Sequence, residues 1–272
     1  MTPSKLKTLL SIAGSDPMGG AGIQADIKTG TMMGLHVVTA VTAVTVQNSN
    51  GLMDLGAVSP DSLNAQLKAI MEDVIPDAIK LGMIGSVENL YIVAKFLKCL
   101  SNEIPIIIDP ILNITANNAK AIEQKDIDTV AKLYIDKLFD FATVITPNLK
   151  ELISLSGNSP LDLNDPLIFL NKLHSKAVII KGGHSDKEMV EDLLITENGM
   201  SISRHKRVIC KNLHGTGCVF SSMIASFLAK GKNLEESFQL TSQNLSDIIL
   251  SSCDYSLGDS SYGPLNINNY RL

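Results

Sequence analysis

The chain has 272 residues, a net charge of −5, 45% apolar residues and no tryptophan. This length suffices for one α/β domain with a large core, although two domains are also possible, and the apolar content argues against disorder. The negative charge and the low aromatic content argue against sequence-independent nucleic-acid binding and against base-stacking platforms. No apolar run approaches the roughly 20 residues of a membrane span, and the N-terminus lacks the core of a signal peptide.

Four cysteines occur, at positions 99, 210, 218 and 253. None of them forms the CxxC spacing of a zinc site. Scattered cysteines in a chain of this length are typical of a reducing compartment. We therefore expect free thiols and a cytoplasmic protein.

Apolar segments with strand and helix periodicity alternate along most of the chain. This alternation predicts a mainly parallel sheet with helices on both faces, and without a repeat or linker it favours a single domain over residues 1–272. Parallel strands joined by right-handed crossovers bring their carboxyl ends to one edge of the sheet. Strands are predicted at 8–13, 37–46, 78–81, 104–108, 142–146 and 177–181, with an antiparallel pair at 192–196 and 201–210. Helices are predicted from Ile23, at 61–73 with Asp61 as its cap, at 87–100, at 126–139, from Pro147, at 165–174, up to Ala229 and at 234–250.

The first strand is followed by a glycine-rich loop, residues 14–22, and a helix. A glycine cluster is most often only a flexible turn. Here Asp16 and Asp26 lie in the loop and the first helical turns. Carboxylates would repel phosphate there but could hydrogen-bond a neutral substrate that carries an amine. We interpret this loop as a site for an organic substrate rather than a phosphate cradle.

The second strand is apolar and β-branched, as in strands covered on both faces. The polar residues 47–51 are predicted to form a turn at its end. Gln47 and Asn48 would then lie at the carboxyl end of a strand, where open α/β sheets bind ligands. For Asn48, simple turn formation explains its presence equally well.

Three later strand ends carry polar candidates. Asp109 follows the strand 104–108 and could serve a metal or catalysis, or it could be a cap or turn residue. Asn148 and Glu151, three residues apart at a helix start, could hold a hydrated Mg²⁺, but a capping box is the preferred interpretation from these residues alone. Lys181 ends a later strand and should face the same edge.

The last motif is His214-Gly215-Thr216-Gly217-Cys218, which leads into an apolar helix. A loop that turns tightly into a helix exposes N–H groups without intrahelical partners, and these groups form an anion site. The same field is expected to lower the pKa of Cys218 and to stabilise its thiolate. The alternative is that Cys218 is a small apolar residue packed under the helix.

Seven motifs occur in order along the chain: GSDPMGGAGIQADIKT, TAVTVQNSNG, KLGMIGS, IIIDPIL, VITPNLKE, VIIKGGH and HGTGCVFSS. Together they make residues 8–265 resemble the hydroxymethylpyrimidine/phosphomethylpyrimidine kinases of thiamin biosynthesis, which belong to the ribokinase-like superfamily. Any one of these motifs is weak, whereas seven in register are specific.

The resemblance implies a ribokinase-like three-layer α/β/α sandwich with a mainly parallel central sheet. It also implies a kinase that uses ATP and Mg²⁺ to phosphorylate 4-amino-5-hydroxymethyl-2-methylpyrimidine and then the monophosphate. Relatives are commonly dimers, which implies a homodimer, with no nucleic-acid or membrane partner. A pyridoxal or pyridoxine kinase on the same scaffold is the closest alternative, and a non-catalytic pyrimidine-binding sensor is a more distant one.

The motifs and the resemblance together assign site residues. The substrate would be bound by Gly14, Asp16, Ala21, Asp26, Gln47 and Met83. The nucleotide would be bound by Asp109, Asn148, Lys181 and Gly217, and the metal by Asp109 and Glu151. Catalysis would use Lys181 with the anion hole Gly215, Thr216, Gly217 and Cys218. Cys218 stands where most sugar kinases of the superfamily have an aspartate base, and it would accept the substrate proton.

One segment departs from the family pattern. After Asp109-Pro110 relatives carry a lysine and small residues, whereas this chain has ILNITANNAK at 111–120. Lys120 is the nearest basic residue, but it stands in a different register. The positive charge missing from the position of the family's lysine is expected to weaken the second phosphorylation, whose acceptor is already a phosphate. Near the end, Tyr262-Gly263-Pro264-Leu265 resembles the terminal element of the family.

Overall fold

The computed structural model describes residues 5–101, 103–112, 124–157, 165–184, 188–257 and 263–269. Most of the unusual segment 111–120, and Tyr262, lie outside the described residues. The strands are β1 (Thr8–Ser15), β2 (His36–Asn48), β3 (Gly51–Ala57), β4 (Ala78–Leu81), β5 (Ile106–Ile108), β6 (Val144–Ile145), β7 (Ala177–Ile180), β8 (Met189–Thr196) and β9 (Gly199–Lys206). The helices are α1 (Gly22–Met32), α2 (Pro60–Asp73), α3 (Val87–Lys98), α4 (Gln124–Lys137), α5 (Leu149–Leu155), α6 (Pro166–Lys172), α7 (Thr216–Ala229) and α8 (Leu234–Ser251).

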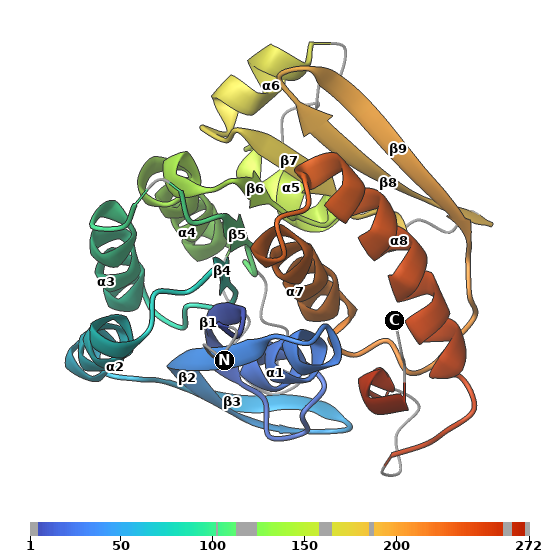
Figure 1. Cartoon of the computed structure of the whole chain (residues 1–272), viewed down its shortest axis with the longest axis horizontal. Helices are drawn as coiled ribbons and strands as arrows, with labels where there is room; N and C mark the ends of the chain where they lie inside the picture. The colour runs from blue at the N-terminus through green and yellow to red at the C-terminus, as the bar shows by residue number, and fades with distance from the viewer. Residues whose placement is uncertain are drawn as a thin grey trace.

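Within the described residues, nine strands form one sheet in the order β3-β2-β1-β4-β5-β6-β7-β8-β9. The ladders from β2 to β7 are parallel, and the edge ladders β2–β3, β7–β8 and β8–β9 are antiparallel. Helices α2 to α6 cover one face, and α1, α7 and α8 cover the other (Figure 1). The predicted mainly parallel sheet with helices on both faces is confirmed.

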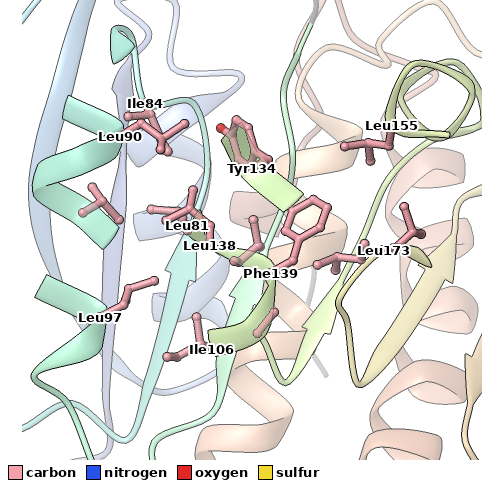
Figure 2. Close-up of a cluster of buried hydrophobic side chains, with 14 of the residues drawn as sticks. Leu81, Ile84, Leu90, Leu97, Ile106, Tyr134, Leu138, Phe139, Leu155 and Leu173 are labelled. Carbon is pink, nitrogen blue, oxygen red and sulfur yellow. The ribbon is translucent and has the colours of Figure 1, made fainter. Parts of the chain in front are cut away.

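Side chains on the central strands alternate between two apolar clusters. Ile106 and Ile108 of β5 pack in the cluster under α2 to α6, whereas Ile107 packs in the cluster under α7 and α8. Figure 2 shows the first cluster, where Leu81 of β4 lies among leucines of α3, and Phe139 lies near Tyr134. Burial on both faces explains why these strands are continuous apolar runs. None of the described helices is long and apolar enough to cross a membrane.

Every predicted helix and strand is present, with its ends shifted by a few residues. The turn predicted at 47–51 is present but shorter, because β2 continues through Asn48 and Gly51 opens a further strand, β3, at the sheet edge. The hairpin turn lies at Ser49-Asn50, and Gly51 has φ 126°, which favours glycine. From the sequence, Asn50-Gly51 indicated the end of a strand, whereas such a pair can also mark a hairpin with a second strand after it.

The cap of α2 also differs from the prediction. Ser59, not Asp61, is the cap, and its Oγ accepts a hydrogen bond from the Ser62 N–H at 3.3 Å. Pro60 occupies the first helical position, which suits its fixed φ and its missing N–H. Asp61 therefore lies inside the first turn, where its negative charge interacts favourably with the helix dipole.

A buried ion pair joins strand β4 to helix α1, and two serine hydroxyls link it to β1 and α7. The side chains of Lys80 in β4 and Asp26 in α1 are both 0% exposed, with Lys80 Nζ 2.9 and 3.0 Å from the two carboxylate oxygens. Asp26 also accepts hydrogen bonds from Ser11 Oγ of β1 at 2.5 Å and from Ser222 Oγ of α7 at 2.6 Å. Burial opposes the charged amine, but the Asp26 carboxylate outweighs it and raises the pKa of Lys80.

We expect Lys80→Met to lower the free energy of unfolding by about 3–5 kcal/mol, because it leaves the Asp26 carboxylate buried without its cation. Urea unfolding followed by circular dichroism measures this loss. Lys68, which forms an exposed pair with Glu72 at 3.8 Å, gives the matched control. Lys68→Met should change the free energy of unfolding by less than about 0.5 kcal/mol. A loss for Lys80→Met as small as that of the control would contradict the structural importance of the pair.

Candidate active site

The loops after the parallel strands meet at the carboxyl edge of the sheet. β1 lies between β2 and β4, so the strand order reverses beside it. Open α/β sheets form their ligand clefts at such a switch point. Two cavities lie here, and we name them the glycine-loop cavity, built around residues 14–22, and the lysine cavity, built around Lys181.

The glycine-loop cavity has a volume of about 340 Å³. Of the predicted substrate residues it is lined by Gly14, Asp16, Ala21, Gln47 and Met83. Its other walls include residues to which the sequence assigned no part in binding, namely Thr45, Leu52, Ile111, His214, Leu257 and Pro264. The apolar members of this set lie far apart in the chain and carry no local signal of a ligand site. Only the folded sheet edge brings them together.

Asp16 holds the glycine-rich loop in shape. Its carboxylate accepts backbone hydrogen bonds from Met18 at 2.9 Å, Gly20 at 3.0 Å and Ala21 at 2.8 Å, and it lies 2.8 Å from His214 Nε2. Burial opposes the charged form of Asp16, but the hydrogen bonds from His214 and from the backbone outweigh it and lower its pKa. Asp16 is therefore a carboxylate that organises the cavity wall.

The predicted substrate role of Asp26 is wrong for this structure. Its side chain is fully buried in the ion pair with Lys80 and does not line either cavity. Both carboxylate oxygens already accept hydrogen bonds from the Lys80 amine and from serine hydroxyls. Asp26 supports the site from beneath instead of contacting a ligand.

The lysine cavity is larger, about 540 Å³. All the predicted nucleotide, metal and anion-hole residues line it: Asp109, Asn148, Glu151, Lys181, Gly215, Thr216, Gly217 and Cys218. An apolar wall of Val190, Val208, Leu213, Leu245 and Ile249 extends from them. His205 and Arg207 at the end of β9, and Asp192 of β8, also line this cavity. The sequence did not single out these three polar residues because they lie in or just after the antiparallel edge pair, where the rule for the carboxyl ends of parallel strands does not apply.

Lys181 and Asp109 form an ion pair at the carboxyl ends of the parallel strands β7 and β5. Lys181 Nζ lies 2.7 Å from Asp109 Oδ1, which also accepts a hydrogen bond from Thr146 Oγ1 at 3.2 Å. The Lys181 side chain is 13% exposed and the Asp109 side chain 2% exposed, so of the two the lysine is the more accessible from the cavity. Burial opposes its charge, but Asp109 and Glu151 outweigh that effect and raise the pKa of Lys181.

Asn148 and Glu151 form the capping box that their spacing indicated. Asn148 Oδ1 accepts from the Glu151 N–H at 3.0 Å, and Glu151 Oε2 accepts from the Asn148 N–H at 2.8 Å. Burial raises the pKa of Glu151 to about 7, with Lys181 opposing the shift and Asp109 adding to it. The described residues contain no cluster of three or more metal-binding side chains. Asp109 and Glu151 nevertheless line the same cavity, and one or two carboxylates are the protein ligands that Mg²⁺ usually takes.

The loop at residues 214–218, which we name the anion loop after its predicted role, packs its backbone against the backbone of the glycine-rich loop. Gly215 has φ 84° and is the residue that precedes α7. A Cβ atom on Gly215 would collide with the carbonyl oxygen of Gly20. Only glycine satisfies both requirements, so the N-terminal N–H groups of α7 are brought to the cavity wall.

Cys218 lies at the junction of the two cavities and, with Ile111, lines both. The predicted lowering of its pKa is wrong. Burial raises the pKa of the thiol to about 11; Lys80 opposes the shift, and Asp26 and Asp109 add to it. The helix N-terminus does favour a thiolate, but desolvation and two nearby carboxylates outweigh it. All four cysteines are free thiols, as expected.

The chain is similar to known proteins over most of its length. A family model described as phosphomethylpyrimidine kinase matches residues 16–266. The hydroxymethylpyrimidine/phosphomethylpyrimidine kinase of Staphylococcus aureus (strain MSSA476) is 36% identical over 238 residues, which cover 85% of this chain and 84% of that protein.

Two solved structures are similar over most of their length. The phosphomethylpyrimidine kinase of Clostridium difficile 630 superposes with a TM-score of 0.72 at 30% identity, covering 90% of this chain and 98% of that one. The S. aureus pyridoxal kinase in complex with AMP-PCP and pyridoxal superposes with a TM-score of 0.82 at 28% identity, covering 98% and 95%. The ribokinase-like fold class is thereby confirmed.

The raised pKa of Cys218 predicts its reactivity. Between pH 7 and 9 the rate of alkylation of Cys218 by iodoacetamide should rise about tenfold per pH unit, because the thiolate fraction does so below the pKa. The rate should stay far below that of Cys99, which is exposed. Peptide mapping by mass spectrometry follows both residues in one sample. A plateau for Cys218 near neutral pH would show that its pKa is lowered after all.

Proposed function

The chain belongs to the phosphomethylpyrimidine kinase family, and we propose that it phosphorylates 4-amino-5-hydroxymethyl-2-methylpyrimidine with ATP, first to the monophosphate and then to the diphosphate, in thiamin biosynthesis. The observation that carries this proposal is the pair of cavities that meet at Cys218 and Ile111. An acceptor in one cavity and a nucleotide in the other would bring the hydroxyl and the terminal phosphate to the same point. Phosphoryl transfer depends mainly on such positioning and on charge stabilisation.

The glycine-loop cavity suits a flat, neutral ring. Met83, Ile111 and Leu52 supply apolar surface, and Gln47 supplies an amide that can hydrogen-bond a heteroaromatic edge. The nearby carboxylate, Asp16, is bonded to backbone N–H groups and His214. Among the residues that the structure describes, the cavity therefore offers polar groups but no unpaired cation that would select a phosphate.

The lysine cavity suits a nucleotide. The Lys181 amine and the N-terminus of α7 supply positive charge for phosphates, and the apolar wall of β8, α8 and the segment after β9 leaves room for a base. We infer that Asp109 and Glu151 hold Mg²⁺, which supplies charge neutralisation on the phosphates when bound. Burial raises the pKa of Glu151 to about 7 and Asp109 adds to the shift, so a cation bound between these two carboxylates would favour the ionised form of both.

Cys218 is the residue best placed to receive the proton of the substrate hydroxyl. Its thiol is neutral in the unliganded protein because burial, Asp26 and Asp109 raise its pKa to about 11. A cation held at Asp109 would remove one of these negative influences. A loose transition state also demands little proton transfer before the phosphoryl group moves. Both considerations fit a thiol that gives up its proton only in the loaded site.

We also infer a homodimer and a cytoplasmic location. β3 is an edge strand, and Val44, Val46 and Met53 of the β2–β3 hairpin are about half exposed. An apolar strand edge of this kind is usually covered by another chain. The cytoplasmic location is supported by the four free thiols.

A second candidate is phosphorylation of pyridoxal. It is favoured by the similarity to the S. aureus pyridoxal kinase over nearly the whole chain. Pyridoxal and the aminopyrimidine are both flat heteroaromatic rings that carry a hydroxymethyl group. The pyrimidine remains the principal substrate because the family model and the relative of higher identity are pyrimidine kinases.

Purified protein with ATP, Mg²⁺ and the aminopyrimidine should yield the monophosphate and then the diphosphate, identified by mass spectrometry. The second step should be the slower one, because the segment 111–120 has no lysine at the position where relatives carry one, and Lys120 stands in a different register. Pyridoxal in a parallel assay should give a lower kcat/KM. Turnover of pyridoxal alone would establish the second candidate, and binding of the pyrimidine without any turnover would favour a sensor.

Replacing Cys218 by Ala should lower kcat about 10²–10⁴-fold while leaving the Kd of the pyrimidine within about threefold, since general-base groups act mainly in the transition state. Cys99→Ala, at an exposed position, is the control and should have normal kinetics. Stopped assays and isothermal titration calorimetry provide the two measurements. Equal losses in binding and turnover would make Cys218 a packing residue.

A further inference from the structure

Three polar side chains meet at one wall of the glycine-loop cavity. His214 Nε2 lies 2.8 Å from Asp16 Oδ2 and 2.9 Å from the terminal amide nitrogen of Gln47. All three residues line the cavity. They come from the loop after β1, the end of β2 and the loop before α7, so the contact links the candidate substrate wall to the anion loop.

The position of His214 is fixed from several sides. Its backbone N–H donates a hydrogen bond to the Gly263 carbonyl oxygen at 3.0 Å. A Cβ atom on Gly20 would collide with the His214 ring, so the ring rests on bare backbone. Asp16 is held in turn by the N–H groups of the glycine-rich loop. The contact between His214 and Asp16 is therefore a built feature of the two loops.

The protonation of His214 Nε2 follows from Asp16. A ring nitrogen either donates its proton or accepts one, and it cannot do both. Asp16 has a lowered pKa and, as a carboxylate, only accepts. The contact at 2.8 Å is therefore a hydrogen bond that requires a proton on Nε2. A nitrogen that carries this proton has no lone pair for an N–H group of Gln47.

The contact with Gln47 fixes the direction of its amide. The nitrogen and oxygen of a terminal amide exchange places by a half-turn about the last bond, and they are assigned from their hydrogen bonds. The group 2.9 Å from Nε2 stands as the amide nitrogen of Gln47, but only a carbonyl oxygen can share the His214 proton there. We therefore assign this contact to the oxygen, which means a half-turn of the amide. The amide NH₂ group is then available to the cavity.

We propose that His214 is a positioning residue that holds the Gln47 amide with its carbonyl oxygen toward Nε2 and its NH₂ group toward the bound ring. This inference rests on the proposed function for the identity of that ring. The cavity then presents a hydrogen-bond donor at Gln47. It selects a ring nitrogen that carries a lone pair and disfavours a ring that places a C–H or N–H group there.

The first test uses His214→Phe, which keeps a flat ring over Gly20 and removes both nitrogens. The KM for the aminopyrimidine should rise about tenfold, as expected for a lost hydrogen-bonding arrangement, with kcat changed less than about threefold and the KM for ATP unchanged. His36→Phe, at an exposed histidine, is the matched control and should have normal constants. A fall in kcat at unchanged pyrimidine KM would overturn the proposal, because His214 would then act on the anion loop.

A double-mutant cycle tests whether His214 acts through Gln47. Gln47→Ala should raise the pyrimidine KM about tenfold or more in the wild-type background. In the His214→Phe background the same change should cost less than about threefold, because the amide is no longer oriented. Two effects that simply multiply would show that the residues act independently and would overturn the proposal.

Gln47→Glu tests the direction of the amide. A carboxylate keeps the acceptor for His214 but has no donor for the ring. Its pyrimidine KM at pH 8 should exceed that of Gln47→Ala, since it adds an acceptor opposite a ring lone pair. A KM for Gln47→Glu equal to or below that of Gln47→Ala means that the cavity-facing group is an acceptor, which overturns the proposal.

Nitrogen NMR of protein labelled with ¹⁵N-histidine tests the premise without any substrate. Nε2 of His214, assigned by its loss in His214→Phe, should have the shift of a protonated ring nitrogen. An unprotonated Nε2 would overturn the inference even if the pyrimidine is phosphorylated. Conversely, a protonated Nε2 in a protein that does not phosphorylate the pyrimidine would refute only the proposed function.

Discussion

The buried pair of Lys80 and Asp26 is the interaction on which the site depends. It joins β4 to α1 and, through the hydroxyls of Ser11 and Ser222, also joins β1 and α7. A buried ion pair is stable only when its geometry is good and its remaining polar atoms are bonded, and both conditions hold here. The N-termini of α1 and α7 carry the two glycine loops, so this pair sets how the loops face each other. The close backbone contact of Gly215 with Gly20 leaves little freedom for any other arrangement.

The two cavities differ in charge, and this difference separates their tasks. Asp16 is the carboxylate of the glycine-loop cavity, and it is satisfied by backbone N–H groups and His214. In the lysine cavity two carboxylates share one lysine, and the pKa of Glu151 is raised to about 7 as a result of burial and its neighbours. A cation would relieve that imbalance, whereas the first cavity has no such need. This difference in charge is why we propose phosphate and metal on the lysine side and a neutral ring on the other.

Features fixed by neighbours in the chain were predictable from the sequence, and features fixed by distant neighbours were not. Parallel strands place Asp109, Asn148 and Lys181 at one edge whatever else the chain does, and the spacing of Asn148 and Glu151 suffices for a capping box. Asp26 was placed at the substrate because the resemblance and its place in an early helical turn suggested it, but its partner Lys80 lies inside an apolar strand 54 residues away. A lysine within a buried strand was the only signal of that pair, and it does not name the partner.

The raised pKa of Cys218 means that a thiol at this position is neutral in the resting protein, where a third carboxylate would add to two that are already close. Asp26 and Asp109 both act on this site and disfavour negative charge there. Burial and both neighbours would also raise the pKa of an aspartate at 218, and its ionised form would be costly before any ligand arrived. A thiol is neutral in the resting protein, so burial and the two carboxylates cost it nothing. The helix N-terminus and Lys80 favour the thiolate only after the charges of the lysine cavity have been balanced. A buried, unreactive resting thiol and a proton acceptor in the loaded site are therefore consistent roles for one residue.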